Sequence, residues 1–172
     1  SALETAMSFG GERKDWQQDL CTINQRLSDV LLANGDVRAA REAAERALAL
    51  SERLVAGDPE NLDWKWTLCN SYQRLSGIEK ASGDLQSGRR LCEQELAIRK
   101  VLAAKNIGHS GWQRDLSVSY GKFGDFALAE HDFESARPAF SKALEVMEGL
   151  AEMDPLNNDW QRDLCYICNR SG

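Results

Sequence analysis

The chain has 172 residues, 28% of them charged, and a formal net charge of −6. Val, Ile and Thr number 14 against 41 Leu and Ala, which disfavours a β-sheet protein because β-branched residues fit a pleated surface best. No apolar run approaches the roughly 20 residues of a membrane span, and the acidic balance disfavours nucleic-acid binding, which needs a positive face, so the sequence predicts an all-α protein with neither membrane nor nucleic acid as a partner.

Four tryptophans recur at a constant interval of 48 residues, at positions 16, 64, 112 and 160. Each unit also carries a leucine at its fifth position and a cation at its eleventh, and coincident columns at one period are typical of a repeat protein. Each unit is predicted to form two helices, A and B. The predicted units are residues 1–15, a remnant of a preceding repeat; residues 16–63, 64–111 and 112–159, three complete repeats; and residues 160–172, the truncated helix A of a fourth repeat.

The first segment, residues 1–15, falls in the register of the end of a helix B. Leu3 lies in the column of Ser51, and Met7 in that of Val55. We therefore expect this segment to pack on Trp16, with a connector at its two consecutive glycines.

Helix A of the first repeat is indicated by apolar residues at steps of three and four. Trp16, Leu20 and Ile23 share one stripe of a 3.6-residue helix. An aspartate precedes three of the four tryptophans, where its side chain can cap the free amides of a helix start. These predicted caps are Asp15, Asp63 and Asp159.

The junction from helix A to helix B is marked by Gly35-Asp36 and Gly83-Asp84. Glycine is favoured just past a helix end and aspartate at a helix start, so these pairs predict the end of one helix and the cap of the next. Helix B then carries small residues for close packing and ends near Asp58-Pro59 and Asp154-Pro155.

The tryptophans are predicted to add a hydrophobic layer to each repeat. A leucine stands ten residues before three of them, so we expect Trp64 to pack on Leu54 and Trp112 on Leu102.

These columns resemble the tetratricopeptide repeat family. The resemblance rests in the first repeat on Leu27-Ser28, Gly35-Asp36, Ala40 and Ala47, and in the third on Phe123-Gly124, Asp132, Ala136, Phe140 and Ala143. The period of 48 exceeds the usual 34, and the extended form is similar to the arms of kinesin light chains and of bacterial regulators. The resemblance implies a right-handed α-solenoid of antiparallel helix pairs that binds partner proteins or peptides on its concave helix-A face.

The concave face is predicted from positions 3, 7, 10 and 14 of each unit, which lie opposite the apolar stripe of helix A. The residues that we expect to bind a partner there are Gln18, Gln25, Trp66, Asn70, Gln73, Arg114, Arg162 and Tyr166. The same positions also hold Thr22, Asp29, Gly77, Val118, Gly121, Asp125 and Asn169. Trp66 interrupts a column of Gln and Arg, which favours an interface role; the alternative is packing on the loop 58–63.

A ladder of cations flanks this face, formed by Arg26, Arg74, Lys122 and Arg170. It could hold acidic side chains or a terminal carboxylate of a peptide. The alternative, which its recurrence in every unit favours, is ion pairing three residues on, as in Arg26–Asp29 and Lys122–Asp125. Chaperone C-termini are disfavoured as ligands, because the positions that match the carboxylate-clamp residues of the family hold glutamine, aspartate and glycine.

No constellation of residues supports catalysis, a cofactor or a metal site. Cys165 and Cys168 have metal or redox spacing, but no second cysteine pair accompanies them, and buried reduced thiols are the favoured interpretation. Five cysteines without a secretory segment favour a reducing, cytoplasmic setting.

The sequence thus predicts a non-enzymatic protein-interaction module, part of a larger intracellular and bacterial protein, without cofactor. One alternative is a self-association module, with homo-oligomers formed through exposed repeat ends. Another is a regulatory arm that controls an enzymatic domain elsewhere in the parent chain.

Overall fold

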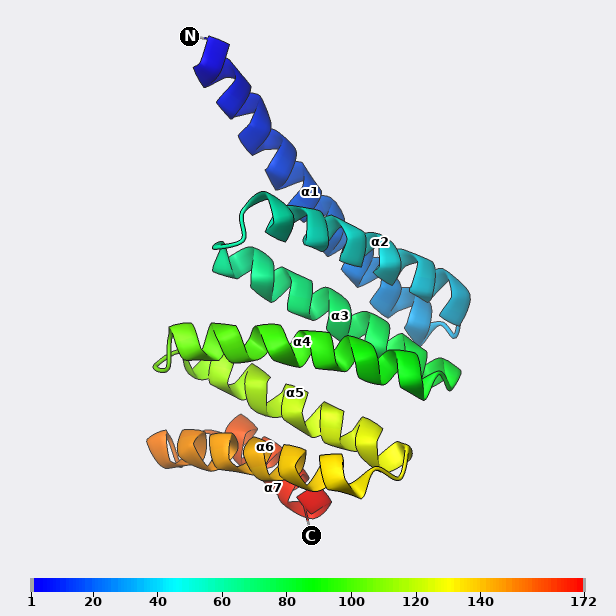
Figure 1. The fold of residues 1–172 in the computed structure, drawn as a ribbon, viewed down its shortest axis with the longest axis vertical. Coiled ribbons are helices and arrows are strands. Elements are labelled where there is room, and N and C mark those ends of the chain that lie inside the picture. Colours follow the sequence, from blue (N-terminus) through cyan, green and yellow to red (C-terminus); the bar gives the residue numbers. More distant parts are fainter. Residues whose placement is uncertain (1, 172) are drawn as a thin grey trace. The chain divides into compact units, whose positions relative to one another are not determined.

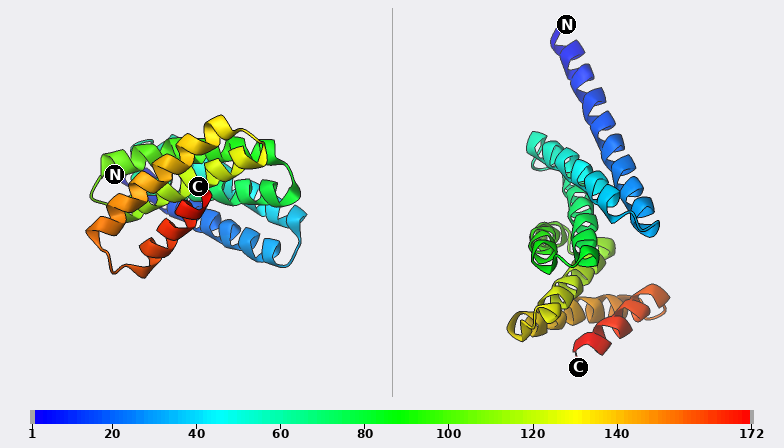
Figure 2. Two further views of the ribbon diagram at one scale, coloured as in Figure 1. Left: turned by 90° about the horizontal axis from the view of Figure 1, so that it is seen from below. Right: turned by 90° about the vertical axis from the view of Figure 1, so that its right-hand side faces the viewer.

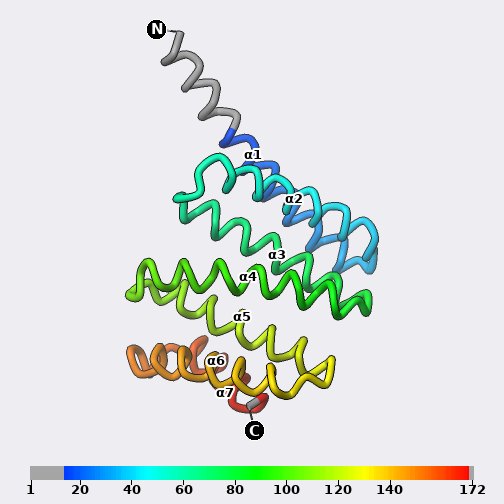
Figure 3. Tube along the Cα trace, in the orientation of Figure 1, coloured from blue at the N-terminus to red at the C-terminus, as the bar shows by residue number. Residues whose placement is uncertain are grey.

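The computed structural model describes the backbone of residues 2–171 and the side chains of residues 14–170. The described residues form seven helices and no strand, which confirms the all-α helical-repeat prediction (Figure 1). The helices are α1 (Ala2–Ala33), α2 (Val37–Gly57), α3 (Leu62–Ser82), α4 (Leu85–Lys105), α5 (Ser110–Ala129), α6 (Phe133–Met153) and α7 (Asn158–Ser171). Figure 3 traces them in chain order.

The chain divides into two compact units, Ser1–Ser82 and Gly83–Gly172. In the first unit α2 packs on both α1 and α3, and α1 touches α3. In the second unit α5 packs on α4 and α6, α6 packs on α7, and α5 touches α7. Within each unit, consecutive helices therefore pack on each other, and successive A helices also meet (Figure 2).

The junctions from helix A to helix B form as predicted. Gly35 and Gly83 have positive φ angles of 82° and 87°, the left-handed conformation that glycine adopts without steric cost. The aspartate that follows each glycine caps the next helix: Oδ1 of Asp36 accepts a hydrogen bond from the amide of Ala39 at 3.0 Å. Asp84 and Asp132 cap α4 and α6 in the same way.

The tryptophan-bearing helices begin earlier than predicted, and their caps lie three residues before the tryptophan. Oδ1 of Asn61 accepts a hydrogen bond from the amide of Trp64 at 3.0 Å, and Asn157 caps Trp160 at 3.2 Å. His109 does the same with Nδ1, at 3.1 Å from the amide of Trp112, and its ring stacks on that tryptophan. The column of caps is therefore Asn61, His109 and Asn157.

The three predicted aspartate caps are accordingly wrong. Asp63 and Asp159 lie in the first turn of α3 and α7, where their charge still suits the positive end of the helix dipole. Asp15 lies inside α1, which continues through it without a junction. The expected packing of the first segment on Trp16 involves side chains of residues 1–13, which lie outside the described residues.

The leucine column predicted to support the tryptophans is buried. Leu54, Leu102 and Leu150 are each at most 3% exposed. Trp160 packs on a cluster that contains Leu150 and Ile167, in agreement with the predicted layer. Trp64 is half-buried, and its indole Nε1 donates a hydrogen bond to Gln18 at 3.0 Å.

Candidate functional site

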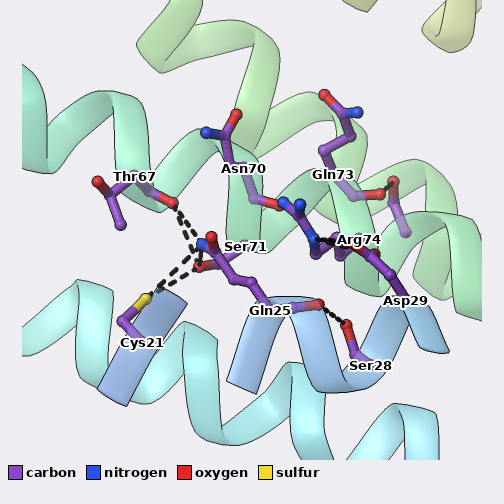
Figure 4. A network of polar contacts seen from close by, with 10 residues as sticks. Cys21, Gln25, Ser28, Asp29, Thr67, Asn70, Ser71, Gln73 and Arg74 are labelled. Carbon is purple, nitrogen blue, oxygen red and sulfur yellow. Dashed lines mark hydrogen bonds and ion pairs between the residues drawn. The ribbon is translucent and has the colours of Figure 1, made fainter. Parts of the chain in front are cut away.

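In the first unit, the side chain of Gln25 joins α1 to α3 (Figure 4). Its Nε2 donates hydrogen bonds to the hydroxyl of Ser71 at 2.9 Å and to the carbonyl of Thr67 at 3.2 Å. Gln25 is only 6% exposed. The prediction that it faces a partner is therefore wrong, because its amide satisfies buried groups between two helices.

Cys21 belongs to the same buried cluster and is a structural thiol. Its Sγ donates a hydrogen bond to the carbonyl of Ala47 at 3.3 Å, and Ser51 joins the cluster through Ser71. Burial raises the pKa of the Cys21 thiol. The thiol thus stays protonated and fills space between helices.

Cys165 occupies the column of Cys21 but is exposed, as is Cys168, so the prediction of buried thiols is wrong for this pair. Cys21 is covered by α2, the helix B that follows α1.

The cation ladder pairs across successive A helices. Nε of Arg74 on α3 lies 3.0 Å and 3.1 Å from the two carboxylate oxygens of Asp29 on α1. Nε of Arg170 on α7 lies 3.5 Å from Asp125 on α5. The predicted pairs Arg26–Asp29 and Lys122–Asp125 are therefore wrong: each of these aspartates pairs with the cation 45 residues later, on the next helix A.

Other residues of the predicted face have varied surroundings. Trp66 is 42% exposed, and the side chains of Asn70 and Gln73 are half-buried.

Nε of Arg114 lies 2.7 Å from Asp163, and this hydrogen bond raises the pKa of the guanidinium. Arg162 is exposed and pairs with Asp159 on its own helix at 3.0 Å. The half-buried Gln18 accepts the indole hydrogen bond of Trp64 at 3.0 Å.

In the second unit, a cavity of 240 Å³ opens between α5 and α7. It is lined by Val118, Gly121, Lys122 and Asp125 of α5 and by Asp163, Tyr166 and Ile167 of α7. Four of these residues (Val118, Gly121, Asp125 and Tyr166) belong to the predicted helix-A face. The structure therefore brings them together at one site.

Gly121 is the reason that this cavity exists. A Cβ added at this buried position would meet no atom within 4 Å. Gly121 occupies the column of Gln25, whose long side chain fills the corresponding space between α1 and α3. The sequence showed a glycine in a column of amides, but the open space could be recognised only once α7 was placed beside α5.

Tyr166 forms the edge of the cavity. It is 52% exposed, and its hydroxyl donates a hydrogen bond to Oδ2 of Asp125 at 3.1 Å. The guanidinium of Arg170 lies 5.6 Å from the centroid of its ring. An apolar recess beside an exposed tyrosine and an arginine has the composition of a protein-interaction hot spot.

Lys122 lines the same cavity but is half-buried, and burial lowers the pKa of its ammonium group. Nearby carboxylates of Glu95 and Asp115 oppose this shift. Arg26, the first cation of the ladder, is exposed.

A buried ion pair within α4 is linked to α5 in the second unit. Glu95 and Arg99 are 0% and 3% exposed, with Nε of Arg99 3.2 Å from the glutamate Oε1. Arg99 also binds Asp115, and the hydroxyl of Ser119 donates a hydrogen bond to Glu95 at 2.8 Å. The equivalent helix-B positions hold Ala47 and Ser51 in the first repeat and Ala143 and Met147 in the third.

Among the described residues there is neither a metal site nor a membrane-spanning helix. No group of three or more His, Cys, Asp or Glu side chains lies where it could hold a metal ion. None of the described helices is both long enough and apolar enough to span a bilayer.

The chain is similar in structure to BtubC (BKLC) from P. vanneervenii, with a TM-score of 0.61 and 17% sequence identity over 98% of this chain and 67% of that one. A de novo designed helical repeat protein, DHR64, aligns with a TM-score of 0.41 and 13% identity over 98% of this chain and 86% of that one. No protein-family model matches the sequence, and no curated protein sequence is similar to it. The likeness to BtubC establishes the fold: this chain is a helical repeat protein.

Proposed function

We propose that this chain is a non-enzymatic protein-interaction module of the tetratricopeptide type, which binds a peptide or a partner domain on its helix-A face. The observation that carries the proposal is the cavity at Gly121, because it is an apolar recess on the predicted face with an exposed tyrosine at its edge. In this proposal, an apolar side chain of the partner enters the cavity and Tyr166 packs against it.

The buried Gln25 supports the proposal by contrast. In the first unit this position holds Gln25, whose buried Nε2 donates hydrogen bonds to Thr67 and Ser71. At Gly121 the same position is left empty, so the second unit keeps a recess that the first unit closes. In the second unit, Arg114 of α5 and Arg162 of α7 belong to the same proposed face. In the first unit, the corresponding face of α3 carries Trp66, Asn70 and Gln73.

The test uses Gly121→Gln, which fills the cavity with the residue that the column carries in α1. Peptides are selected from a random phage-displayed library on the wild-type protein, and their affinities are measured by fluorescence anisotropy. We expect the variant to bind them at least tenfold more weakly, because its side chain occupies the recess.

Gly149→Gln is the matched control, because Gly149 is an exposed glycine of the helix B α6, away from the helix-A face, with open space around it. It should bind the same peptides as the wild type does. Equal affinity of both variants for every selected peptide would refute the assignment of the cavity as the binding site.

A second candidate function, self-association, is favoured by the apolar stripe of α1. Trp16, Leu20, Ile23, Leu27 and Val30 are all exposed large hydrophobics. In α5 the residue equivalent to Leu20 is buried against helix B of the preceding repeat. The stripe of α1 is therefore a surface that repeats of this type cover with another helix.

A further inference from the structure

The second unit contains another cavity, on the side of α5 that faces away from the α5–α7 cavity. It has a volume of 370 Å³ and lies between α4 and α6, with α5 beneath it. Tyr120 and Phe123 of α5 line it, whereas Val118 and Gly121 line the first cavity. At about 100° per residue, these two pairs point to opposite sides of a helix.

The cavity is apolar within and positively charged at its edge. Leu96, Phe123 and Ala139 contribute its buried or half-buried apolar walls. Lys100 of α4 and Lys142 of α6 are exposed and also line it. An apolar recess bordered by cations is complementary to a segment that combines an apolar side chain with carboxylates.

Both lysines meet at the ring of Tyr120. The Nζ atoms of Lys100 and Lys142 lie 5.3 Å and 5.7 Å from its centroid. Cation–π contacts of exposed side chains are weak, of the order of 1 kcal/mol or less. Within the part of the chain that has described side chains, neither lysine has an ion pair with a carboxylate. The two ammonium groups therefore lie beside the same ring and are available to an anionic ligand.

Comparison with the equivalent residues of the first unit shows that this charge is particular to the site. The tyrosine equivalent to Tyr120 is Tyr72, whose hydroxyl donates a hydrogen bond to Glu52 at 3.1 Å. Burial and this carboxylate raise the pKa of Tyr72 to about 12. The position of Glu52 holds Lys100 in the second repeat and Glu148 in the third. The repeat thus reverses its charge only beside this cavity.

The one acidic residue at the cavity edge is already engaged. Glu93 pairs with Nε of Arg89 at 3.3 Å. The same guanidinium binds Glu130 at 2.6 Å and Asp132 at 2.8 Å, which raises the pKa of Arg89. Among the ion pairs of the described side chains, Glu93 pairs with Arg89 and with neither Lys100 nor Lys142.

We propose that this cavity is a second binding site, which takes an acidic peptide segment. An apolar or aromatic side chain of the segment enters the recess over Phe123 and Ala139. Carboxylates on either side of it pair with Lys100 and Lys142. A polyanion such as nucleic acid fits less well, because a chain with a net charge of −6 repels it and offers only two lysines here.

The probe is a capped hexapeptide with glutamates on both sides of a central phenylalanine, titrated into the full chain labelled with ¹⁵N. We expect amide shifts to concentrate on α4 and α6 around Ala97 and Ala139. Lys100→Glu should raise the dissociation constant at least tenfold, because it reverses one of the two charges. This variant is expected to fold, since the repeat itself places glutamate at positions 52 and 148.

Arg53→Glu is the matched control, because it makes the same charge change at an exposed position of another helix B, α2. It should leave the dissociation constant unchanged. Ala97→Leu, which narrows the recess with a good helix former, should weaken binding, and so should a peptide with alanine in place of phenylalanine.

Three results would overturn the proposal: equal affinities of Lys100→Glu and Arg53→Glu, shifts that map elsewhere, or no shifts at millimolar peptide. Inorganic phosphate is a further probe, and if it displaces the peptide as well as the peptide itself does, the site binds anions only. Gly121→Gln leaves this cavity intact, so failure of the helix-A proposal is distinguishable from failure of this one.

Discussion

Two glycines of α5, Gly121 and Gly124, differ in how much space surrounds them. A Cβ at Gly121 would enter open space, whereas a Cβ at Gly124 would lie 2.7 Å from Cζ of Phe140. Gly124 therefore permits the close approach of α5 and α6, and Gly121 leaves room beside α7. The same residue type serves close packing at one position and an empty recess at the other.

Substitution by alanine should separate these two roles. Gly121→Ala is expected to stabilise the protein by roughly 0.5–1 kcal/mol, because alanine is the better residue in a helix interior. Gly124→Ala is expected to destabilise it by about 1–3 kcal/mol through overpacking against Phe140. Urea unfolding of both variants measures the two changes. Changes of the same sign would contradict the difference in packing described for α5.

At the scale of the element, each helix-A-to-B junction could be predicted because its determinants are local. Gly35-Asp36 supplies a left-handed residue and a cap within two positions, and no distant contact is needed. The start of the tryptophan-bearing helices was mispredicted because two acceptors compete there. Asn61 and Asp63 both have capping side chains, and only the path of the chain shows that Asn61 performs the role.

The candidate site was predictable only in part. Helical periodicity placed Val118, Asp125 and Tyr166 on one face, and the structure gathers them around the α5–α7 cavity. Periodicity could not show that the side chain of Gln25, on the same face, is buried between α1 and α3. A position on a helix wheel fixes the direction of a side chain, whereas its burial depends on the neighbouring helix.

The buried ion pair of α4 gives a prediction at this same scale. Glu95→Ala or Arg99→Met alone should destabilise the protein by about 3–5 kcal/mol, because each leaves a buried charge with fewer partners. The double variant recreates the Ala143 and Met147 pair of α6, so its cost should be smaller than the sum of the single costs. A double-mutant cycle from urea unfolding tests this, and additive costs would argue against coupling between the two charges.

At the scale of the whole molecule, the exposed stripe of α1 is a large apolar surface on an otherwise highly charged chain. Its members follow one another at helical spacing, so they form one continuous face. Continuous exposed apolar patches in proteins mark interaction surfaces more often than scattered residues do.

The double variant Leu20→Gln, Ile23→Gln should reduce self-association. In sedimentation velocity over a dilution series, the sedimentation coefficient of the wild type is expected to rise with concentration. That of the variant is expected to stay at the monomer value. Ile107→Gln with Leu156→Gln is the control, because both residues are exposed apolar side chains in connecting loops. A wild type that remains monomeric at every concentration would exclude self-association through α1.

The five cysteines differ in exposure, which allows selective labelling of the exposed thiols. Cys21, Cys69 and Cys92 are buried, so a maleimide dye applied to the folded protein should attach at Cys165 and Cys168 of α7. These two thiols flank Tyr166 and Ile167, which line the α5–α7 cavity. The emission of an environment-sensitive fluorophore placed there would follow occupancy of the recess directly, even for a partner that carries no chromophore.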